Sequence, residues 1–155
     1  MDNKQRQVID ADEILERYIA GERNFSNILI EGSDELAGAD LREINLSHSI
    51  LTEMILEEVN FSNSNLTKTN LGLSILYSAN IQRADLTEAI LTFTELTNAN
   101  LTDTKLINAN LSNTSMVMVN LTNANLTSSN IEEAYFDKCI LQNTITSDGR
   151  VPDNL

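Results

Sequence analysis

Large apolar residues return at every fifth position through most of this chain, and this spacing constrains the fold more than any other feature. From Leu36 to Leu141, all 22 such positions hold leucine, isoleucine, methionine or phenylalanine. An α-helix repeats every 3.6 residues and a β-strand every two, so neither explains a period of five. A regular repeat of this kind has to be interpreted before any secondary structure is assigned. We call the apolar position the centre of each pentad.

The residues around each centre indicate how the chain is bent. The residue two before the centre is mostly small, as at Ala99, and the residue between them is often asparagine or aspartate, as at Asn100. Residues two apart on an extended chain point to the same side, so the small residue and the centre face inward together. The next inward residue comes three positions later, so the chain must turn a corner in each pentad. Stacked coils of such units, about 4.8 Å apart, predict an all-β solenoid.

The pattern resembles the pentapeptide-repeat proteins, whose motif is A(D/N)LXX. It stands here at Ala39–Leu41, Ala84–Leu86, Ala99–Leu101, Ala109–Leu111 and Ala124–Leu126. The resemblance covers about Phe25 to Leu141 and implies a right-handed quadrilateral β-helix with four pentapeptides in each coil. The stretches Ala20–Ser26 and Asp148–Arg150 are similar to those that flank the repeats in cyanobacterial members.

The repeat slips in phase once, near its start. Phe25 and Ile30 fit the period, but Leu36 comes six residues after Ile30, so Glu31–Glu35 holds one extra residue in a bulge or small loop. With Phe25 and Ile30 the chain has 24 centres. We therefore expect about six coils and a rod about 25–30 Å tall.

The two ends of the repeat are expected to differ. Residues 10–20 carry apolar side chains at helical spacing, with Asp10 or Asp12 as a start signal and Gly21 as a stop signal, which predicts a short helix covering the first coil. A second interpretation is that this helix binds a partner. Downstream, Asp148 and Gly149 predict a hairpin turn. We therefore divide the chain into an N-terminal helical cap (1–22), the β-helix (23–145) and a C-terminal turn and tail (146–155).

Composition narrows the classes of function. The 155 residues carry a net charge of −13, which disfavours direct binding of nucleic acid, a polyanion. The first residues show no secretory signal and no apolar run approaches the length needed to span a membrane, so we expect a cytoplasmic protein. Acidic residues crowd the first 58 positions, which hold 14 of the 23, and Glu43, Glu53, Glu57 and Glu58 there form a candidate acidic patch.

The sequence contains no set of residues typical of an enzyme. Its one cysteine, Cys139, falls at an inward position, which predicts a buried, unreactive thiol, and its one histidine, His48, is predicted to point outward. Adjacent acids such as Glu57 and Glu58 are predicted to lie on solvated corners. We therefore expect no catalysis, no metal site and no cofactor.

Some large apolar residues stand at positions where the repeat predicts polar ones. Stacking the chain in 20-residue coils places Leu73 under Phe93 and Ile55 under Ile75. A contiguous exposed apolar patch indicates an interface, although scattered exposed apolar residues are also common. The predicted partner-binding patch consists of Ile55, Leu73, Ile75, Tyr77, Phe93, Val117 and Met118.

Two classes of function follow from these observations. The first is a rigid protein–protein interaction or scaffold module, monomeric or weakly self-associating, with an unidentified protein partner. The alternative comes from family members that mimic duplex DNA and inhibit or protect DNA gyrase, which the acidity favours. The near balance of charge between Phe61 and Ile131 disfavours it. Threonines in one column, Thr67, Thr87 and Thr127, suggest ice binding more weakly, because Ile107 interrupts them.

Overall fold

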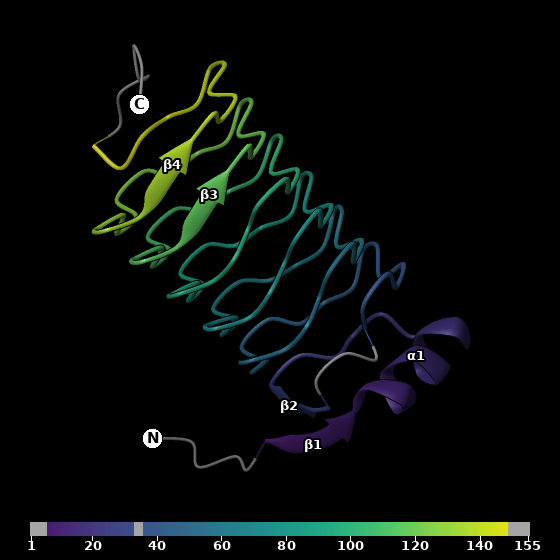
Figure 1. Cartoon of the computed structure of the whole chain (residues 1–155). Helices are drawn as coiled ribbons and strands as arrows, with labels where there is room; N and C mark the ends of the chain where they lie inside the picture. Colours follow the sequence, from purple (N-terminus) through teal and green to yellow (C-terminus); the bar gives the residue numbers. More distant parts are fainter. Residues whose placement is uncertain (1–5, 33–35, 149–155) are drawn as a thin grey trace.

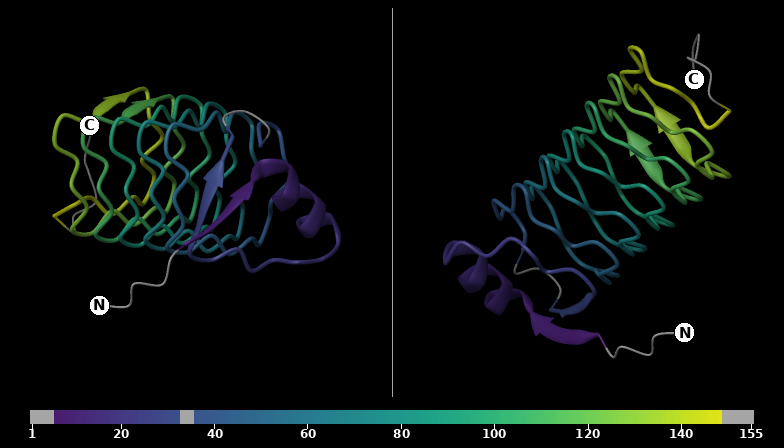
Figure 2. Two further views of the ribbon diagram at one scale, coloured as in Figure 1. Left: turned by 90° about the horizontal axis from the view of Figure 1, so that it is seen from below. Right: turned by 180° about the vertical axis from the view of Figure 1, so that it is seen from behind.

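The repeats stack as a solenoid, in the order of the sequence. The computed structural model describes residues 6–32 and 36–148. Its elements are β1 (Gln7–Asp10), α1 (Ala11–Ile19), β2 (Ile28–Glu31), β3 (Ser115–Val117) and β4 (Tyr135–Asp137). The coils follow one another along one axis, with α1, β1 and β2 at one end and β3 and β4 towards the other (Figures 1 and 2).

From Asp40 onward, the residue before the centre pairs in parallel with the residue 20 positions further along, which is four pentads. Examples are the bridges Asp40 to Asn60 and Asn100 to Asn120, and β3 pairs with β4 in the same register. Most of these pairings are single bridges rather than long strands, because only three residues of each pentad are extended before the next corner.

The predicted slip in phase is confirmed by the register. Asn24 pairs with Asn45, a spacing of 21 residues, whereas the later coils pair at 20. One extra residue therefore lies between the first coil and the second. The predicted bulge itself, at Glu31–Glu35, falls mostly on residues 33–35, which lie outside the described residues.

All five backbone N–H groups of a typical pentad are hydrogen-bonded, which explains its composition. For residues 99–103 the acceptors are the carbonyl oxygens of Leu96, Ala79, Asn120 and Thr122 and, for the Thr102 N–H, the side-chain oxygen of Asn100 at 3.1 Å. The second residue after each centre has a positive φ, such as +59° at Asp103. Because glycine and asparagine adopt this conformation most easily, asparagine suits both this position and the one before the centre.

The interior is filled by the centres. From Leu36 to Leu126 each of them is at most 3% exposed, and burying a leucine fully contributes about 1.5–3 kcal/mol. Most inward serine and threonine hydroxyls donate to the carbonyl oxygen of a centre one coil below, as Thr94 does to Leu71 at 3.1 Å and Thr144 to Leu121 at 2.7 Å, whereas Ser64 donates to Phe61 in its own coil at 2.6 Å. The buried hydroxyl of Ser129 is an exception, since no described residue accepts its hydrogen bond.

The N-terminal segment is only partly the helix that the sequence predicts. Asp10 is the N-cap of α1 and accepts a hydrogen bond from the Glu13 N–H at 2.7 Å, and Gly21, with φ +100°, follows the end of the helix. Ile14 is fully buried in the core. The strand β1, which the sequence analysis missed, pairs in parallel with β2 and extends one side of the stack below the first coil.

The last described coil is less covered than the others. Its centres Ile131, Phe136 and Leu141 are half-buried, because no further described coil packs on them. The predicted hairpin turn falls only partly on the described residues, because Gly149 and the rest of the predicted tail, residues 149–155, lie outside them.

Candidate functional site

Five of the seven predicted patch residues form one contiguous apolar surface. Leu73, Ile75 and Tyr77 alternate along one side of a single coil, so all three point outward. Ile55 pairs with Ile75 from the coil below. Phe93 lies one coil above Leu73, since the Leu73 N–H donates to the carbonyl oxygen of Thr92, the residue before Phe93. Phe93 and Leu73 are 59% and 56% exposed, Tyr77 and Ile75 41% and 37%, and Ile55 is half-buried. We call these five residues the apolar face.

Val117 and Met118 lie on the same side of the solenoid but apart from the apolar face. They stand two coils above Tyr77 and Ser78, a rise of about 10 Å. The intervening coil presents Thr97 and Asn98, and the Asn98 side-chain amide donates to the Tyr77 hydroxyl at 3.0 Å. Thr97 and Asn98 therefore separate Val117 and Met118 from Tyr77.

Two residues of the apolar face occupy a backbone conformation that disfavours them. Leu73 has φ +63° and Phe93 φ +57°, in the left-handed region. Every corner of the repeat uses this region, but most other corners place asparagine or a charged or small residue there. A bulky side chain in this conformation costs about 1–2 kcal/mol. Their presence is therefore not explained by the stability of the turn.

The two isoleucines also replace a hydrogen-bonding residue. Elsewhere the residue before the centre is often asparagine, whose side chain accepts from the backbone N–H two residues on, as Asn120 does from Thr122 at 3.0 Å. Ile55 and Ile75 cannot accept, so within the described part of the chain the N–H groups of Glu57 and Tyr77 have no side-chain acceptor of this kind. The apolar face thus weakens the corners that carry it.

Three of the four predicted acidic residues border the apolar face. Glu53 and Glu57 flank Ile55 on the coil below Leu73 and Tyr77, and Glu58 follows at the corner. All three are exposed. Glu43 is not part of this group, because it falls in another corner column, with Asn63 one coil above.

Glu95, which pairs with Ile75 from the coil above, borders the apolar face too, although it is not among the predicted acidic residues. Its carboxylate accepts hydrogen bonds from the N–H and hydroxyl of Thr97. Adding 20 to position 75 would have found it. We call Glu53, Glu57, Glu58 and Glu95 the acidic rim.

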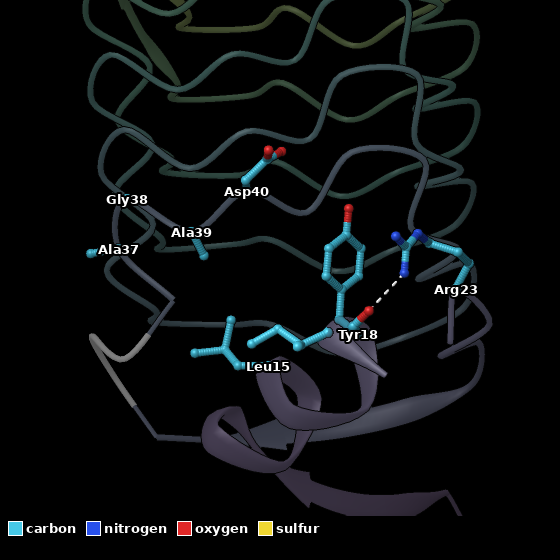
Figure 3. Close-up of a pocket in the computed structure, with 8 residues that line it drawn as sticks. Leu15, Tyr18, Arg23, Ala37, Gly38, Ala39 and Asp40 are labelled. Atoms are coloured by element: carbon cyan, nitrogen blue, oxygen red, sulfur yellow. Dashed lines mark hydrogen bonds between the residues drawn. The ribbon is translucent and has the colours of Figure 1, made fainter. Parts of the chain in front are cut away.

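A cavity of about 430 Å³ lies where α1 meets the first coil. Leu15, Tyr18 and Arg23 line one side of it, and residues 37–40 the other (Figure 3). The Tyr18 hydroxyl donates to the Arg42 carbonyl oxygen at 2.8 Å, and the Arg23 guanidinium stacks on the Tyr18 ring at 3.8 Å. These contacts use the polar groups of the cavity to fasten the helix to the coils.

The lone cysteine and the lone histidine take no part in either feature. Cys139 is half-buried rather than buried, its thiol donates to the Met116 carbonyl oxygen at 2.9 Å, and burial raises its pKa. His48 is exposed, as predicted. Within residues 6–32 and 36–148, no three histidine, cysteine or acidic side chains gather in a group able to hold a metal ion. In the same ranges no helix has the length and apolar character needed to cross a bilayer.

The fold and its corner chemistry define a repeat protein of the solenoid class. A profile described as pentapeptide repeats matches 8 copies, over residues 55–92, 94–117 and 104–143. These segments cover more than half of the chain, and the chain therefore belongs to the pentapeptide-repeat family. A search of curated proteins found no match.

Solved structures of the same family resemble the chain. The pentapeptide-repeat protein Rfr23 from the cyanobacterium Cyanothece 51142 is 26% identical, with 88% of this chain and 99% of that one covered and a TM-score of 0.41. HetL from the cyanobacterium Nostoc, a protein involved in regulating heterocyst differentiation, is 21% identical, with coverages of 93% and 100% and a TM-score of 0.24. Trypsin-treated QnrB1, a plasmid-mediated fluoroquinolone resistance protein, is 21% identical, with coverages of 82% and 79% and a TM-score of 0.50. The likeness to QnrB1 shows a shared fold.

Proposed function

We propose that this chain is a non-enzymatic interaction module that binds another protein through its apolar face. The observation that carries the proposal is the position of Leu73 and Phe93, which are more than half exposed in a backbone conformation that disfavours them. Side chains that neither fill the core nor suit their corner contribute little to folding. Conformationally costly residues cluster at functional sites, and contiguous exposed apolar surface is typical of interfaces.

The finer architecture is part of the same proposal. The 20-residue pairing supports a quadrilateral β-helix of about six coils. The family resemblance implies that the chain winds in a right-handed sense. The burial of Ile14 supports α1 as a cover for the N-terminal end. A rod of this kind holds the apolar face rigid, so a partner that binds it orders few side chains of this protein.

The non-enzymatic part rests on how the interior is used. The centres fill it, and inward hydroxyls such as those of Thr94 and Thr144 donate to carbonyl oxygens instead of being free to act as nucleophiles. The half-buried thiol of Cys139 has a raised pKa, which disfavours the reactive thiolate.

The proposal is tested by capture of partners from the native organism. We expect the wild-type protein to retain a partner that the Ile75→Lys/Tyr77→Lys variant loses, because two ammonium groups would have to be desolvated at the interface. Asn65→Lys/Thr67→Lys is the matched control, since it alters the same two pentad positions ten residues earlier, on the opposite side of the coil. If Ile75→Lys/Tyr77→Lys retains the same proteins as the wild type, the proposal is refuted. Unfolding of this double variant would show that the two residues belong to the core.

A second candidate is a DNA-mimicking inhibitor or protector of DNA gyrase. The net charge of −13 and the fold shared with QnrB1 favour it. The middle coils argue against it. Their cations pair with carboxylates one coil away, as Lys105 does with Asp85 at 3.1 Å, and these pairs interrupt any acidic stripe along the rod. A supercoiling assay with purified gyrase decides between the two. Inhibition at low micromolar protein supports the mimic, and its absence refutes it.

A further inference from the structure

Charge is distributed unevenly around the apolar face. The segments that carry the apolar face are residues 52–58, 72–78 and 92–98, and residues 112–118 stack on them. The charged residues of these four segments are the glutamates of the acidic rim, without lysine or arginine. One coil further along, residues 132–138 add three acids and Lys138, which pairs with Asp137. Among the described residues, Glu53, Glu57, Glu58 and Glu95 form no ion pair, and the hydrogen bonds of the Glu95 carboxylate come from Thr97. The apolar face is therefore bordered by unneutralised carboxylates.

The opposite side of the same coils is different. Residues 61–131 contain three cations, which are Lys68, Arg83 and Lys105. Ten residues are half of a coil, so all three lie on the side opposite the apolar columns. Each pairs with a carboxylate 20 residues away, Lys68 with Glu88 at 3.3 Å, Arg83 with Asp103 at 3.6 Å, and Lys105 with Asp85 at 3.1 Å. The chain thus neutralises its acids on that side and leaves them unpaired beside the apolar face.

A protein that covers the apolar face also removes water from these carboxylates. A carboxylate that loses water without gaining a partner is strongly unfavourable, whereas one that meets a cation favours both specificity and the rate of association. Glu53 and Glu57 lie one coil below Leu73 and Tyr77, about 5 Å away along the axis, and Glu95 lies one coil above Ile75. A partner with a row of apolar side chains and a cation on each side of it would place its cations next to these carboxylates.

We infer that the occupant of the apolar face is a protein segment that presents aliphatic or aromatic side chains flanked by lysine or arginine. This inference rests on the proposed function, since it identifies the partner of the same surface. It disfavours a second copy of this chain as the occupant, because a copy with the same net charge of −13 would bring carboxylates to carboxylates.

The test uses a phage-displayed library of random 12-residue peptides, selected on the immobilised protein and counter-selected on Ile75→Lys/Tyr77→Lys. We expect the recovered peptides to be enriched in lysine and arginine next to apolar residues. A synthetic copy of the dominant peptide should bind about tenfold more weakly to Glu53→Gln/Glu57→Gln/Glu58→Gln, since three exposed charge pairs are removed. Its affinity should also fall with salt.

The matched control is Glu16→Gln/Glu43→Gln/Glu88→Gln, which removes the same net charge away from the apolar face and should bind the peptide as the wild type does. Equal weakening by both triple variants would show a general charge effect and overturn the inference.

The remaining outcomes separate the inference from the proposed function. Peptides that require Ile75 and Tyr77 but lack basic residues, or that ignore the glutamine substitutions, overturn the inference and leave the proposed function standing. A dimer in sedimentation that Ile75→Lys/Tyr77→Lys abolishes would make a second copy the occupant and also overturn the inference. If no peptide depends on Ile75 and Tyr77, both the inference and the proposed function fail.

Discussion

Replacing the two bulky corner residues by asparagine separates the stability of the solenoid from the use of its apolar face. Leu73→Asn with Phe93→Asn places at both corners a residue that tolerates positive φ and occurs at many other corners of this chain. The substitution also removes the two most exposed side chains of the apolar face.

The expected change in stability is a balance of two terms. Since Leu73 and Phe93 are 56% and 59% exposed, each buries about two fifths of its surface, worth about 0.6–1.3 kcal/mol of the roughly 1.5–3 kcal/mol for full burial. Relief of the left-handed backbone returns about 1 kcal/mol at each corner. The free energy of unfolding of the double variant should therefore lie within about 1 kcal/mol of the wild type, or about 2–4 °C in Tm.

Urea denaturation followed by circular dichroism measures this change. Leu71→Ala is the control, because Leu71 is a fully buried centre two residues before Leu73, and it should lose about 2–5 kcal/mol. Capture of the partner by the double variant should be lost at the same time. A double variant destabilised as much as Leu71→Ala would mean that the apolar face is core, and the reasoning would be wrong.

Three further predictions test the interior and one surface ion pair. Leu96→Asp puts a carboxylate at a fully buried centre and should cost more than about 4 kcal/mol, so an unchanged urea midpoint would contradict the inward orientation of the centres. Ser129→Ala removes a buried hydroxyl that no described residue accepts and should raise the free energy of unfolding by about 1 kcal/mol, whereas a loss of stability would indicate an acceptor. Hydrogen bonds and charge from the Arg42 guanidinium lower the pKa of Asp40, so Asp40 contributes stability above the unfolded pKa of about 4 that is lost as the pH falls through its lower folded pKa. Arg42→Gln should move this pKa back up in a carboxyl NMR titration and remove that acid dependence, and an unmoved pKa would refute the assignment.

Much of the fold could be predicted because its rule is local. The pentad alone identifies the buried centres, the asparagine before them and the corner after them, and the spacing of six between Ile30 and Leu36 revealed the extra residue. The strand β1 could not be predicted from pattern, since its four residues become a strand only by pairing with β2. The helix carried its own cap and stop signals, so its position was predicted to within a residue at each end.

The candidate site was predicted only in part. Stacking by 20 brought Leu73 and Phe93 together and also placed Thr97 between Tyr77 and Val117, yet the predicted patch kept Val117 and Met118. Only the structure showed the hydrogen bond from Asn98 to Tyr77 in that gap. Grouping acids by their place in the sequence put Glu43 with the other acids and omitted Glu95. Acids close in sequence fall on different corners of the coil, whereas acids 20 or 40 residues apart share a side.

The sequence by itself determined which residues of each pentad face inward, because that choice depends on neighbours within five residues and on the low free energy of buried leucine. Only the tertiary structure decided which side of the coil each outward residue joins and whether a charge finds a partner there. Closure of the coil sets these relations, since it brings residues 20 positions apart to within about 5 Å. The unpaired acids beside the apolar face and the paired acids opposite are therefore properties of the stack rather than of any single pentad.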